Sequence, residues 1–227
     1  KFINPNLNYD STEKISQNTY KLSGIFLQGV DRYSGDDYVS GLNGETQIEF
    51  SELHTQYKTV TYDSKGRRQE HWHTIFRGIF FSADFNKNFN AKTFVLTDTA
   101  EKLFGFLGTK LQKINKSHGS LVKLEDPEFE KKFVVYSDDQ TEARYLLSPS
   151  LMSRVVDFVE KSKKNIQLSF VESRLFIAIP FSKSLFEPRL FGEIIGLNNI
   201  IDYYEDLNLA IDLVDDLNLN IRIWSKE

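Results

Sequence analysis

Alternating apolar and polar positions over residues 38–50 predict a pair of antiparallel β-strands. Two alternating runs, 38–42 and 45–50, flank Asn43 and Gly44. An Asn-Gly pair between such runs is the strongest short hairpin signal that a sequence carries, because both residues tolerate the left-handed backbone of a tight turn. We therefore expect a hairpin here.

The second strand of that hairpin continues through alternating positions to Val60, and residues 63–66 then turn the chain back. The return strand, 72–85, is nearly continuous in Thr, Ile and Phe. Such a run is typical of a strand buried on both faces, or of one in the middle of a curved sheet where Gly78 permits a bulge. Shorter runs predict strands at 92–96, 121–124 and 133–136, a turn at 126–127, and a hairpin of 166–171 with 174–181.

Apolar residues spaced every three or four positions predict helices at four places. Ser16 is suited to cap a short helix that starts at residue 17, and a second helix is expected over 100–107. Pro149 suits the first turn of an amphipathic helix, which ends in a cluster of lysines that favours its dipole. The last helix, 200–214, carries its acidic residues mostly off the apolar stripe.

This order of elements, with hairpins instead of βαβ units, predicts an α+β fold. We expect a largely antiparallel, strongly curved sheet or sheets built from hairpins, with three or four helices packed on it. The polar stretch 109–120 is the place where a boundary is expected if the chain divides. Otherwise residues 1–227 are expected to form a single soluble domain.

The composition is that of a globular protein, with 40% hydrophobic and 26% charged residues, and its 19 Phe predict a Phe-rich core. The absence of cysteine excludes disulfides, thiolate metal sites and cysteine nucleophiles. A net charge of −4 gives no overall field that attracts nucleic acid, so no nucleic-acid partner is expected. The densest apolar run, 175–181, has the length of a strand and is too short to span a membrane.

Three histidines are candidate metal ligands. His71 and His73 are two residues apart and share one face of a strand, and His54 lies on the preceding strand. Three imidazoles can bind zinc and leave a position open for water. The alternative is the polar face of an exposed hairpin, since the spacing is common and fixes no fourth ligand.

Other charged clusters are weaker signals. The basic clusters 65–68 and 161–164 could contact anionic lipid headgroups, but both are smaller than the roughly four to eight charges of a strong lipid-binding segment. The acidic clusters 125–130 and 138–142 lack an adjacent nucleophile elbow or phosphate loop, so capping and ion pairing explain them better. We expect no cofactor. The sequence favours a non-enzymatic protein but leaves an enzymatic activity open.

Several strings occur together along the chain: LSGIF (22–26), DRYSGDD (31–37), Gly41 with Gly44, FSELH (50–54), FRGIFF (76–81), DFNK (84–87), LEDPEFE (124–130), VYSDDQ (135–140) and EARYLLSP (142–149). In combination they resemble the bacterial domain of unknown function 3137 family, from about Leu22 to Pro180. The resemblance implies a soluble C-terminal domain that follows one or two hydrophobic membrane segments. It transfers no catalytic role to any residue.

The chain begins at Lys1 without an initiating Met, which suggests that it was trimmed from a longer protein. Together with the resemblance, this predicts the cytoplasmic part of a bacterial inner-membrane protein, anchored through segments before Lys1. Among the recurring polar residues, the candidate binding residues are Glu52, His54, Asp84 and Arg144.

Three functions remain open. The first is a non-enzymatic binding or scaffolding domain with a protein or lipid partner, since edges of an antiparallel sheet can accept a peptide strand. The second is a metal-assisted hydrolase that uses His54, His71 and His73. The third is a structural domain that positions membrane segments or an oligomer.

Overall fold

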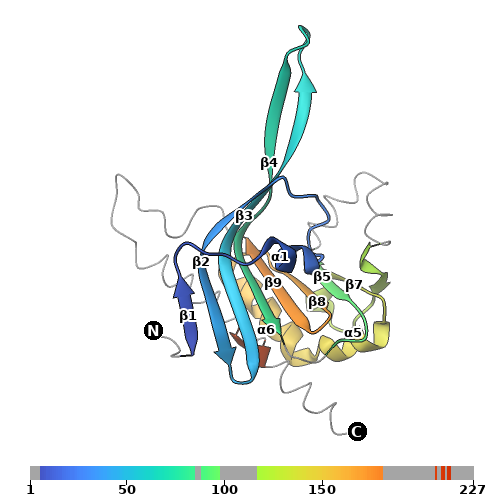
Figure 1. The fold of residues 1–227 in the computed structure, drawn as a ribbon. Helices are drawn as coiled ribbons and strands as arrows, with labels where there is room; N and C mark the ends of the chain where they lie inside the picture. Colours follow the sequence, from blue (N-terminus) through green and yellow to red (C-terminus); the bar gives the residue numbers. More distant parts are fainter. Residues whose placement is uncertain are drawn as a thin grey trace.

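The fold is built on one open β-sheet (Figure 1). The computed structural model describes residues 6–84, 88–97 and 117–180, with residues 208, 211, 212, 214 and 215 near the C-terminus. Its strands are β1 (Leu7–Asp10), β2 (Arg32–Asn43), β3 (Thr46–Tyr62), β4 (Arg68–Asp84), β5 (Thr93–Thr97), β6 (Ser120–Val122), β7 (Phe133–Ser137), β8 (Gln167–Val171) and β9 (Arg174–Pro180). Its helices are α1 (Gln17–Leu22), α4 (Pro127–Glu130), α5 (Gln140–Leu146) and α6 (Pro149–Ser162).

The nine strands are ordered β1-β2-β3-β4-β9-β8-β5-β7-β6, and neighbouring strands pair antiparallel. With the four described helices, this is an α+β architecture, as expected. The sheet is neither closed nor strongly curled, so the strong curvature that we expected is not seen (Figure 1). Its outer strands, β1 and β6, are short, as sheet edges commonly are.

Several predicted elements are confirmed. The hairpin of β2 and β3 turns at Gly44 and Glu45, directly after Asn43. Ser16 is the N-cap of α1, and its side chain accepts a hydrogen bond from the backbone N–H of Thr19. The hairpin of β8 and β9 and the amphipathic helix α6, with Pro149 in its first turn, also form as predicted.

Three elements were not predicted. The expected turn at 126–127 is the start of helix α4, because the Asp126 carboxylate accepts hydrogen bonds from the N–H groups of Glu128 and Phe129. Helix α5 is capped in the same way by Asp139. Strand β1 was also missed. The predicted helix 100–107 lies outside the described residues, and the five described residues from 208 onward are helical.

Residues 109–116 of the candidate boundary also lie outside the described residues. Strands from both sides of this stretch pair with each other, since β5 lies between β7 and β8. The sheet is therefore continuous across it. No helix in the described part of the chain is long and apolar enough to cross a membrane.

The sheet carries a hydrophobic cluster on each face. One cluster packs the strands against α4, α5 and α6 and includes Phe50, Phe81 and Phe170. The other packs them against α1 and the segments around it, and includes Tyr20, Phe80 and Phe176. Phe80 and Phe81 are both fully buried although they point to opposite faces, which confirms that the middle of β4 is buried on both sides.

The hairpin of β3 and β4 extends well beyond the sheet (Figure 1). Strand β2 pairs with β3 only as far as Gln56, and β9 pairs with β4 only from Gly78 onward. Residues 57–73 therefore form a two-stranded ribbon in which, within the described chain, each strand pairs only with the other. We call residues 57–73 the arm.

A bulge lies just below the arm. The register of β3 and β4 shifts between Thr55 and Gln56, so that Ile75 is left without a partner. The bulge is thus near Gly78 but not at it. Gly78 has a different role, because a Cβ there would lie 2.1 Å from the carbonyl oxygen of Ile179 in the neighbouring strand.

Candidate functional site

The arm presents two different faces, because side chains alternate along a strand. Its directly paired residues are Tyr57 with His73, Thr59 with His71 and Thr61 with Gln69 on one face, and Lys58 with Trp72, Val60 with Glu70 and Tyr62 with Arg68 on the other. The first set is uncharged apart from its imidazoles, and we call it the His/Thr face. The second combines aromatic and charged side chains, and we call it the cationic–aromatic face.

On the His/Thr face each imidazole contacts a threonine. Nε2 of His73 lies 2.8 Å from Oγ1 of Thr59, and Nε2 of His71 lies 3.1 Å from Oγ1 of Thr61. The His73 ring also stacks on Tyr57, with 4.8 Å between ring centroids. These contacts tie the two strands together, as cross-strand pairs commonly do.

The third candidate ligand, His54, does not join them. It lies three residues before Tyr57 on β3, so its side chain is on the opposite side of the strand from Tyr57 and the paired His73. Its Nε2 is 3.2 Å from Oγ1 of Thr74. Partial burial and the nearby guanidinium groups of Arg77 and Arg32 lower the pKa of His54. The structure therefore does not bring the three imidazoles together as a metal site.

The cationic–aromatic face is organised around Trp72. The guanidinium of Arg32, from β2, lies 3.9 Å from the centre of the Trp72 ring, and Nζ of Lys58 lies 5.5 Å from it. Glu70 bridges two cations, at 3.3 Å from Lys58 Nζ and 2.6 Å from Arg68 Nη1. The face thus holds several cations and one carboxylate that partly neutralises them.

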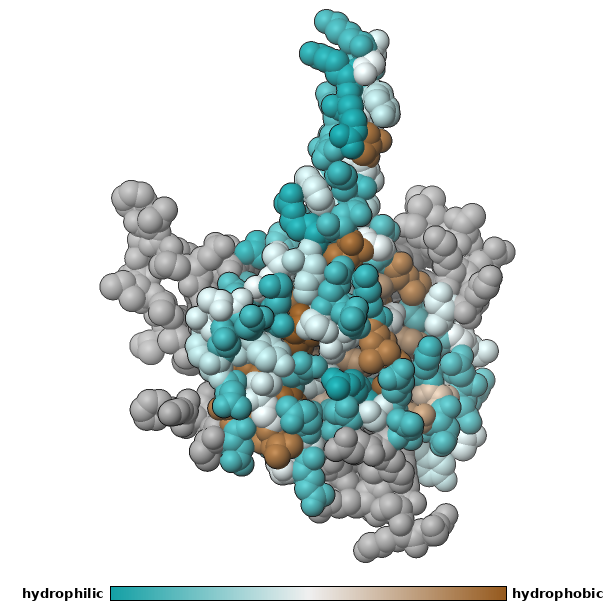
Figure 2. Space-filling model, viewed as in Figure 1, coloured by the Kyte–Doolittle hydropathy of each residue, from teal (hydrophilic) through white to brown (hydrophobic). Residues whose placement is uncertain are grey.

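Large side chains on this face remain exposed. Tyr62 is 69% exposed and Val60 40% exposed. Over most of its length the arm has a hydrophilic surface (Figure 2). Tyr, Trp and Arg are the residue types that contribute most binding energy in protein interfaces.

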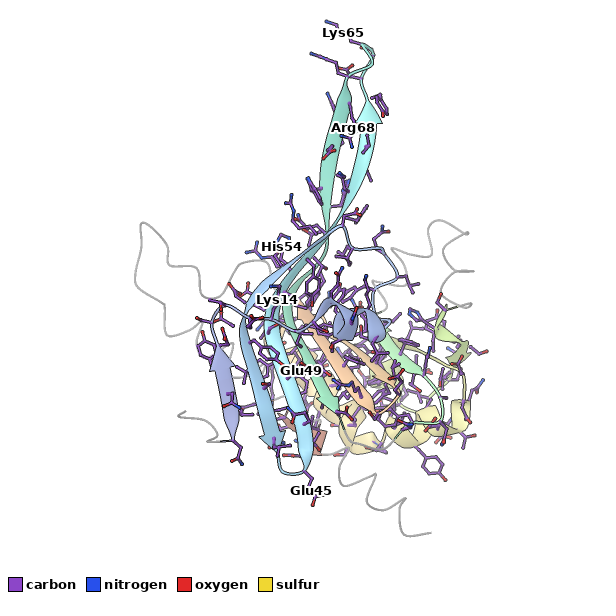
Figure 3. All side chains as sticks on the ribbon, in the orientation of Figure 1. Lys14, Glu45, Glu49, His54, Lys65 and Arg68 are labelled. Carbon is purple, nitrogen blue, oxygen red and sulfur yellow. The ribbon has the colours of Figure 1, made fainter. Side chains whose placement is uncertain are left out.

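The tip of the arm is a basic turn held by hydrogen bonds to Asp63. Oδ1 of Asp63 accepts hydrogen bonds from the backbone N–H groups of Lys65 and Arg67, both at 2.9 Å, and Oδ2 lies 2.7 Å from Nε of Arg67. The hydrogen bonds from Arg67 are the main reason why the pKa of Asp63 is lowered. Lys65 lies at this end, farthest from the sheet, and Arg68 follows in the outermost pair of the ribbon (Figure 3).

Two candidate binding residues, Asp84 and Arg144, lie outside the arm and have structural partners there. Asp84 lies 3.0 Å from Nη2 of Arg174 and accepts a hydrogen bond from Ser173, while Nη1 of Arg174 lies 3.0 Å from Glu49. Arg144 is exposed and donates to the backbone carbonyls of Gln140 and Lys123. Arg144 therefore joins α5 to the segment after β6.

Glu52 lies in an acidic cluster that the sequence did not predict. Oxygen atoms of Asp36, Asp37 and Glu52 all lie within 4.8 Å of one another, and it is the only such group of potential ligands among the described residues. The hydroxyl of Tyr9 donates a hydrogen bond to Asp37, and this bond raises the pKa of Tyr9 to about 12. Carboxylates suit Mg²⁺ or Ca²⁺. The adjacent Asp36-Asp37 pair was the available signal, but its position opposite Glu52 depends on strand register.

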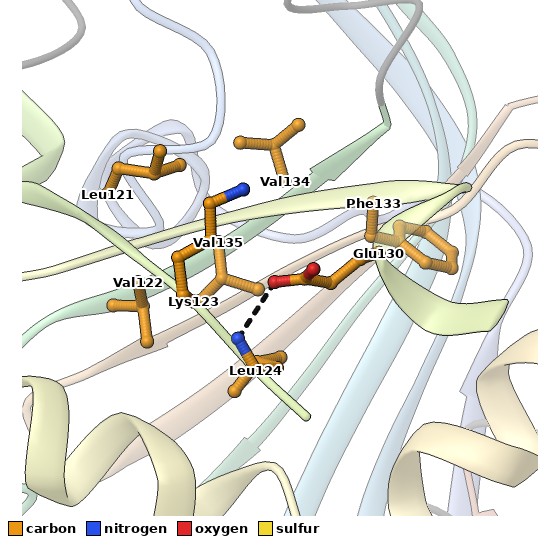
Figure 4. Close-up of a pocket in the computed structure, with 8 residues that line it drawn as sticks. All are labelled: Leu121, Val122, Lys123, Leu124, Glu130, Phe133, Val134 and Val135. Carbon is orange, nitrogen blue, oxygen red and sulfur yellow. Dashed lines mark hydrogen bonds between the residues drawn. The ribbon is translucent and has the colours of Figure 1, made fainter. Parts of the chain in front are cut away.

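A pocket of about 280 Å³ lies at β6, the edge strand five positions away from β4 in the sheet (Figure 4). Strands β6 and β7 and the segment before α4 line it, mostly with aliphatic side chains. Oε1 of Glu130 accepts a hydrogen bond from the backbone N–H of Leu124, at 2.8 Å. Two charged side chains therefore line the pocket: Glu130, which already accepts this hydrogen bond, and Lys123.

Comparisons with known proteins locate the chain in a family. A family model described as a protein of unknown function (DUF3137) matches residues 74–219, which is more than half of the chain. No curated protein matches the chain. Among solved structures, the crystal structure of the mycobacterial trehalose monomycolate transport factor A, TtfA, aligns with a TM-score of 0.44 and 11% sequence identity, over 93% of this chain and 86% of that chain. The chain belongs to the DUF3137 family of proteins of unknown function.

Proposed function

We propose that this protein is a non-enzymatic binding domain and that the arm is its docking element. The observation that supports this proposal is the projection of residues 57–73 beyond the sheet, where neither strand of the ribbon has another strand beside it in the described chain. An isolated two-stranded hairpin is only marginally stable in water. The arm contributes nothing to either hydrophobic cluster, so a role in binding accounts for it better than a role in the fold.

The metal-assisted hydrolase is the weaker proposal. His71 and His73 face one side of the ribbon and are engaged with Thr61 and Thr59, whereas His54 lies on the other side. A zinc centre needs its ligands within about 2.0–2.1 Å of one ion. Forming one from these residues would require rearrangement of the ribbon.

The cellular setting is also part of the proposal. The sequence resemblance supports a domain that is tethered to a bacterial inner membrane and faces the cytoplasm. Fractionation of the full-length gene product, with a reporter fused to its C-terminus, tests this setting. Recovery in the soluble fraction, or a reporter active only outside the cytoplasm, would contradict it.

Site-specific cross-linking tests the docking role. A photoreactive residue placed at Tyr62, 69% exposed on the arm, is expected to give discrete protein adducts in the native host. The matched control is Tyr145 on α5, which is 60% exposed but lies on the body of the domain. Equal adduct patterns at the two positions would contradict a docking arm. A metal-dependent turnover that persists after the arm is removed would contradict the non-enzymatic role.

A further inference from the structure

We infer that the cationic–aromatic face of the arm binds an acidic, extended protein segment. This inference rests on the proposed function and specifies the partner of the same arm. It uses three features of the structure: the charge of the arm, the linear arrangement of its side chains, and the position of Glu70.

The charge of the arm is opposite to that of the protein. Residues 57–73 contain four Lys or Arg and two acidic side chains, a net charge of +2 in a chain of −4. The ribbon from Gln56 to Tyr62 spans about 20 Å at the rise of a β-strand. This exceeds two Debye lengths at physiological ionic strength, where one is about 8 Å. The arm can therefore attract an anionic partner even though the body is acidic.

The binding groups form a line along the strand direction. Each pair of opposite residues on this face joins an apolar or aromatic side chain to a charged one: Trp72 with Lys58, Val60 with Glu70 and Tyr62 with Arg68. The Arg32 guanidinium lies over Trp72 at the base of this row. An extended peptide presents side chains on one face at the same spacing, and it can also pair with a free strand edge. Acidic side chains on such a peptide would reach the cations of this face, and apolar side chains would reach Val60 and Tyr62 beside them.

Glu70 occupies the place that an incoming carboxylate would take. It contacts both Lys58 and Arg68, at 3.3 and 2.6 Å, and its own side chain is one-third exposed. A carboxylate from a partner must compete with Glu70 for these cations. Removing the charge of Glu70 should therefore strengthen binding, whereas a purely structural role for Glu70 predicts no gain.

Two other anionic partners fit the arm less well. A membrane would meet the tip first, and the turn residues Ser64, Lys65 and Gly66 offer no apolar side chain to insert into lipid. A single-stranded nucleic acid needs several free aromatic faces for base stacking. The Trp72 ring is already covered by Arg32, while Tyr62 is the strongly exposed ring of this face.

Binding of a labelled model peptide tests the inference. The probe is a fluorescein-labelled peptide that repeats Glu-Ser-Val-Ser, so that Glu and Val share one face of the extended chain, followed by anisotropy. A peptide that repeats Gln-Ser-Val-Ser is the uncharged comparison. In a Trp224→Phe background, the fluorescence of Trp72 reports the same binding from the protein side. We expect the acidic peptide to bind, the neutral peptide to bind at least about tenfold more weakly, and added salt to weaken the complex.

Paired charge variants test the direction in which each charge of the arm changes the affinity for the peptide. Glu70→Gln should tighten binding about two- to fivefold and Lys58→Gln should weaken it about two- to fivefold, within the range of a surface ion pair. Glu128→Gln and Lys131→Gln make the same charge changes in an ion pair on the body, and they should leave binding unchanged. Weaker binding by Glu70→Gln, or equal effects of arm and body variants, would overturn the inference.

Alternative ligands separate this inference from the proposed function. Vesicles of phosphatidylcholine with phosphatidylglycerol, and an oligouridylate, are tested against the same variants. If either binds through the arm and the acidic peptide does not, the partner class is wrong but the arm is still a docking element. If no probe binds through the arm and Tyr62 gives no specific adduct, both are wrong.

Discussion

His118 donates a hydrogen bond from Nε2 to the carbonyl oxygen of Gly24, at 2.8 Å, and joins two segments that lie 94 residues apart. Its side chain is buried, and the ring lies 4.1 Å from that of Phe94 between centroids. Nδ1 has no hydrogen-bond partner within the described chain, so a second proton would be placed there without an acceptor. Burial accordingly lowers the pKa of His118.

We predict that the protein becomes less stable as the pH falls from about 7 to about 5. Below a pH of about 6.5 the unfolded chain binds a proton at His118 more readily than the native protein does, so protonation favours unfolding. One such group changes the free energy of unfolding by at most about 1.4 kcal/mol per pH unit. Urea unfolding at several pH values measures this slope. His118→Gln, which keeps a donor but does not titrate, should flatten it more than His54→Gln; an unchanged slope would contradict the prediction.

Arg174→Met is expected to destabilise the protein by about 1–3 kcal/mol. The substitution removes the cation that lies 3.0 Å from both Glu49 and Asp84, and these carboxylates are mostly buried. Arg154→Met is the control, since its 3.6 Å pair with Asp212 is about half exposed and should contribute no more than about 0.5 kcal/mol.

Chemical denaturation of both arginine variants measures the difference. Neutralising the carboxylates as well, with Glu49→Gln and Asp84→Asn, should restore much of the loss in the Arg174→Met protein. Equal losses of stability in Arg174→Met and Arg154→Met would show that the ion pairs of Arg174 with Glu49 and Asp84 contribute no more than an exposed ion pair does.

Gly78→Ala is expected to disrupt the pairing of β4 with β9. The new Cβ would lie 2.1 Å from the carbonyl oxygen of Ile179 and 2.8 Å from Cα of Pro180, so the backbones must separate. The expected cost is about 1–3 kcal/mol, typical of an overpacked site. Gly29→Ala has nothing within 4 Å of its Cβ and serves as the control. If Gly78→Ala and Gly29→Ala shift the thermal unfolding temperature equally, the close approach of Ile179 to Gly78 is refuted.

Excision of the arm should leave the body folded. Gln56 and Thr74 are paired across the ribbon, so an Asn-Gly turn can join them in place of residues 57–73. We expect the free energy of unfolding to change by less than about 1 kcal/mol, because no arm residue belongs to either core cluster. Phe81→Ala, in contrast, should cost about 3–5 kcal/mol. Loss of cooperative unfolding after excision would show that the arm is part of the fold.

Local signals were enough to predict many elements. Asn43 and Gly44, the Ser16 cap and Pro149 each act within a few residues of their own position, and the structure has the hairpin and the two helices that they predict. Helix α5 was missed because it is short and only Ala143 and Leu146 are buried in it. Its cap at Asp139 was the signal that could have identified it.

Longer-range relationships could not be predicted in this way. His54 and His73 were candidate ligands of one metal because their strands are adjacent, but the alternation of side chains places them on opposite sides. The acidic cluster likewise depends on a register that brings Glu52 opposite Asp36. The arm had one overlooked signal, since residues 57–73 lack the continuous apolar face that a strand within a sheet would show.

The strand order has a consequence for biosynthesis. Strands β4 and β5 are close in sequence, but the hairpin of β8 and β9 separates them in the sheet. Until the ribosome has released residues 167–171 the inner edge of β5 has no native partner, and until it has released residues 174–180 the inner edge of β4 has none. Such late, long-range pairing slows folding and exposes strand edges that can aggregate. The β8–β9 hairpin thus joins the two parts of the described sheet, and a nascent chain that stops before residue 167 presents two open edges that this hairpin later pairs.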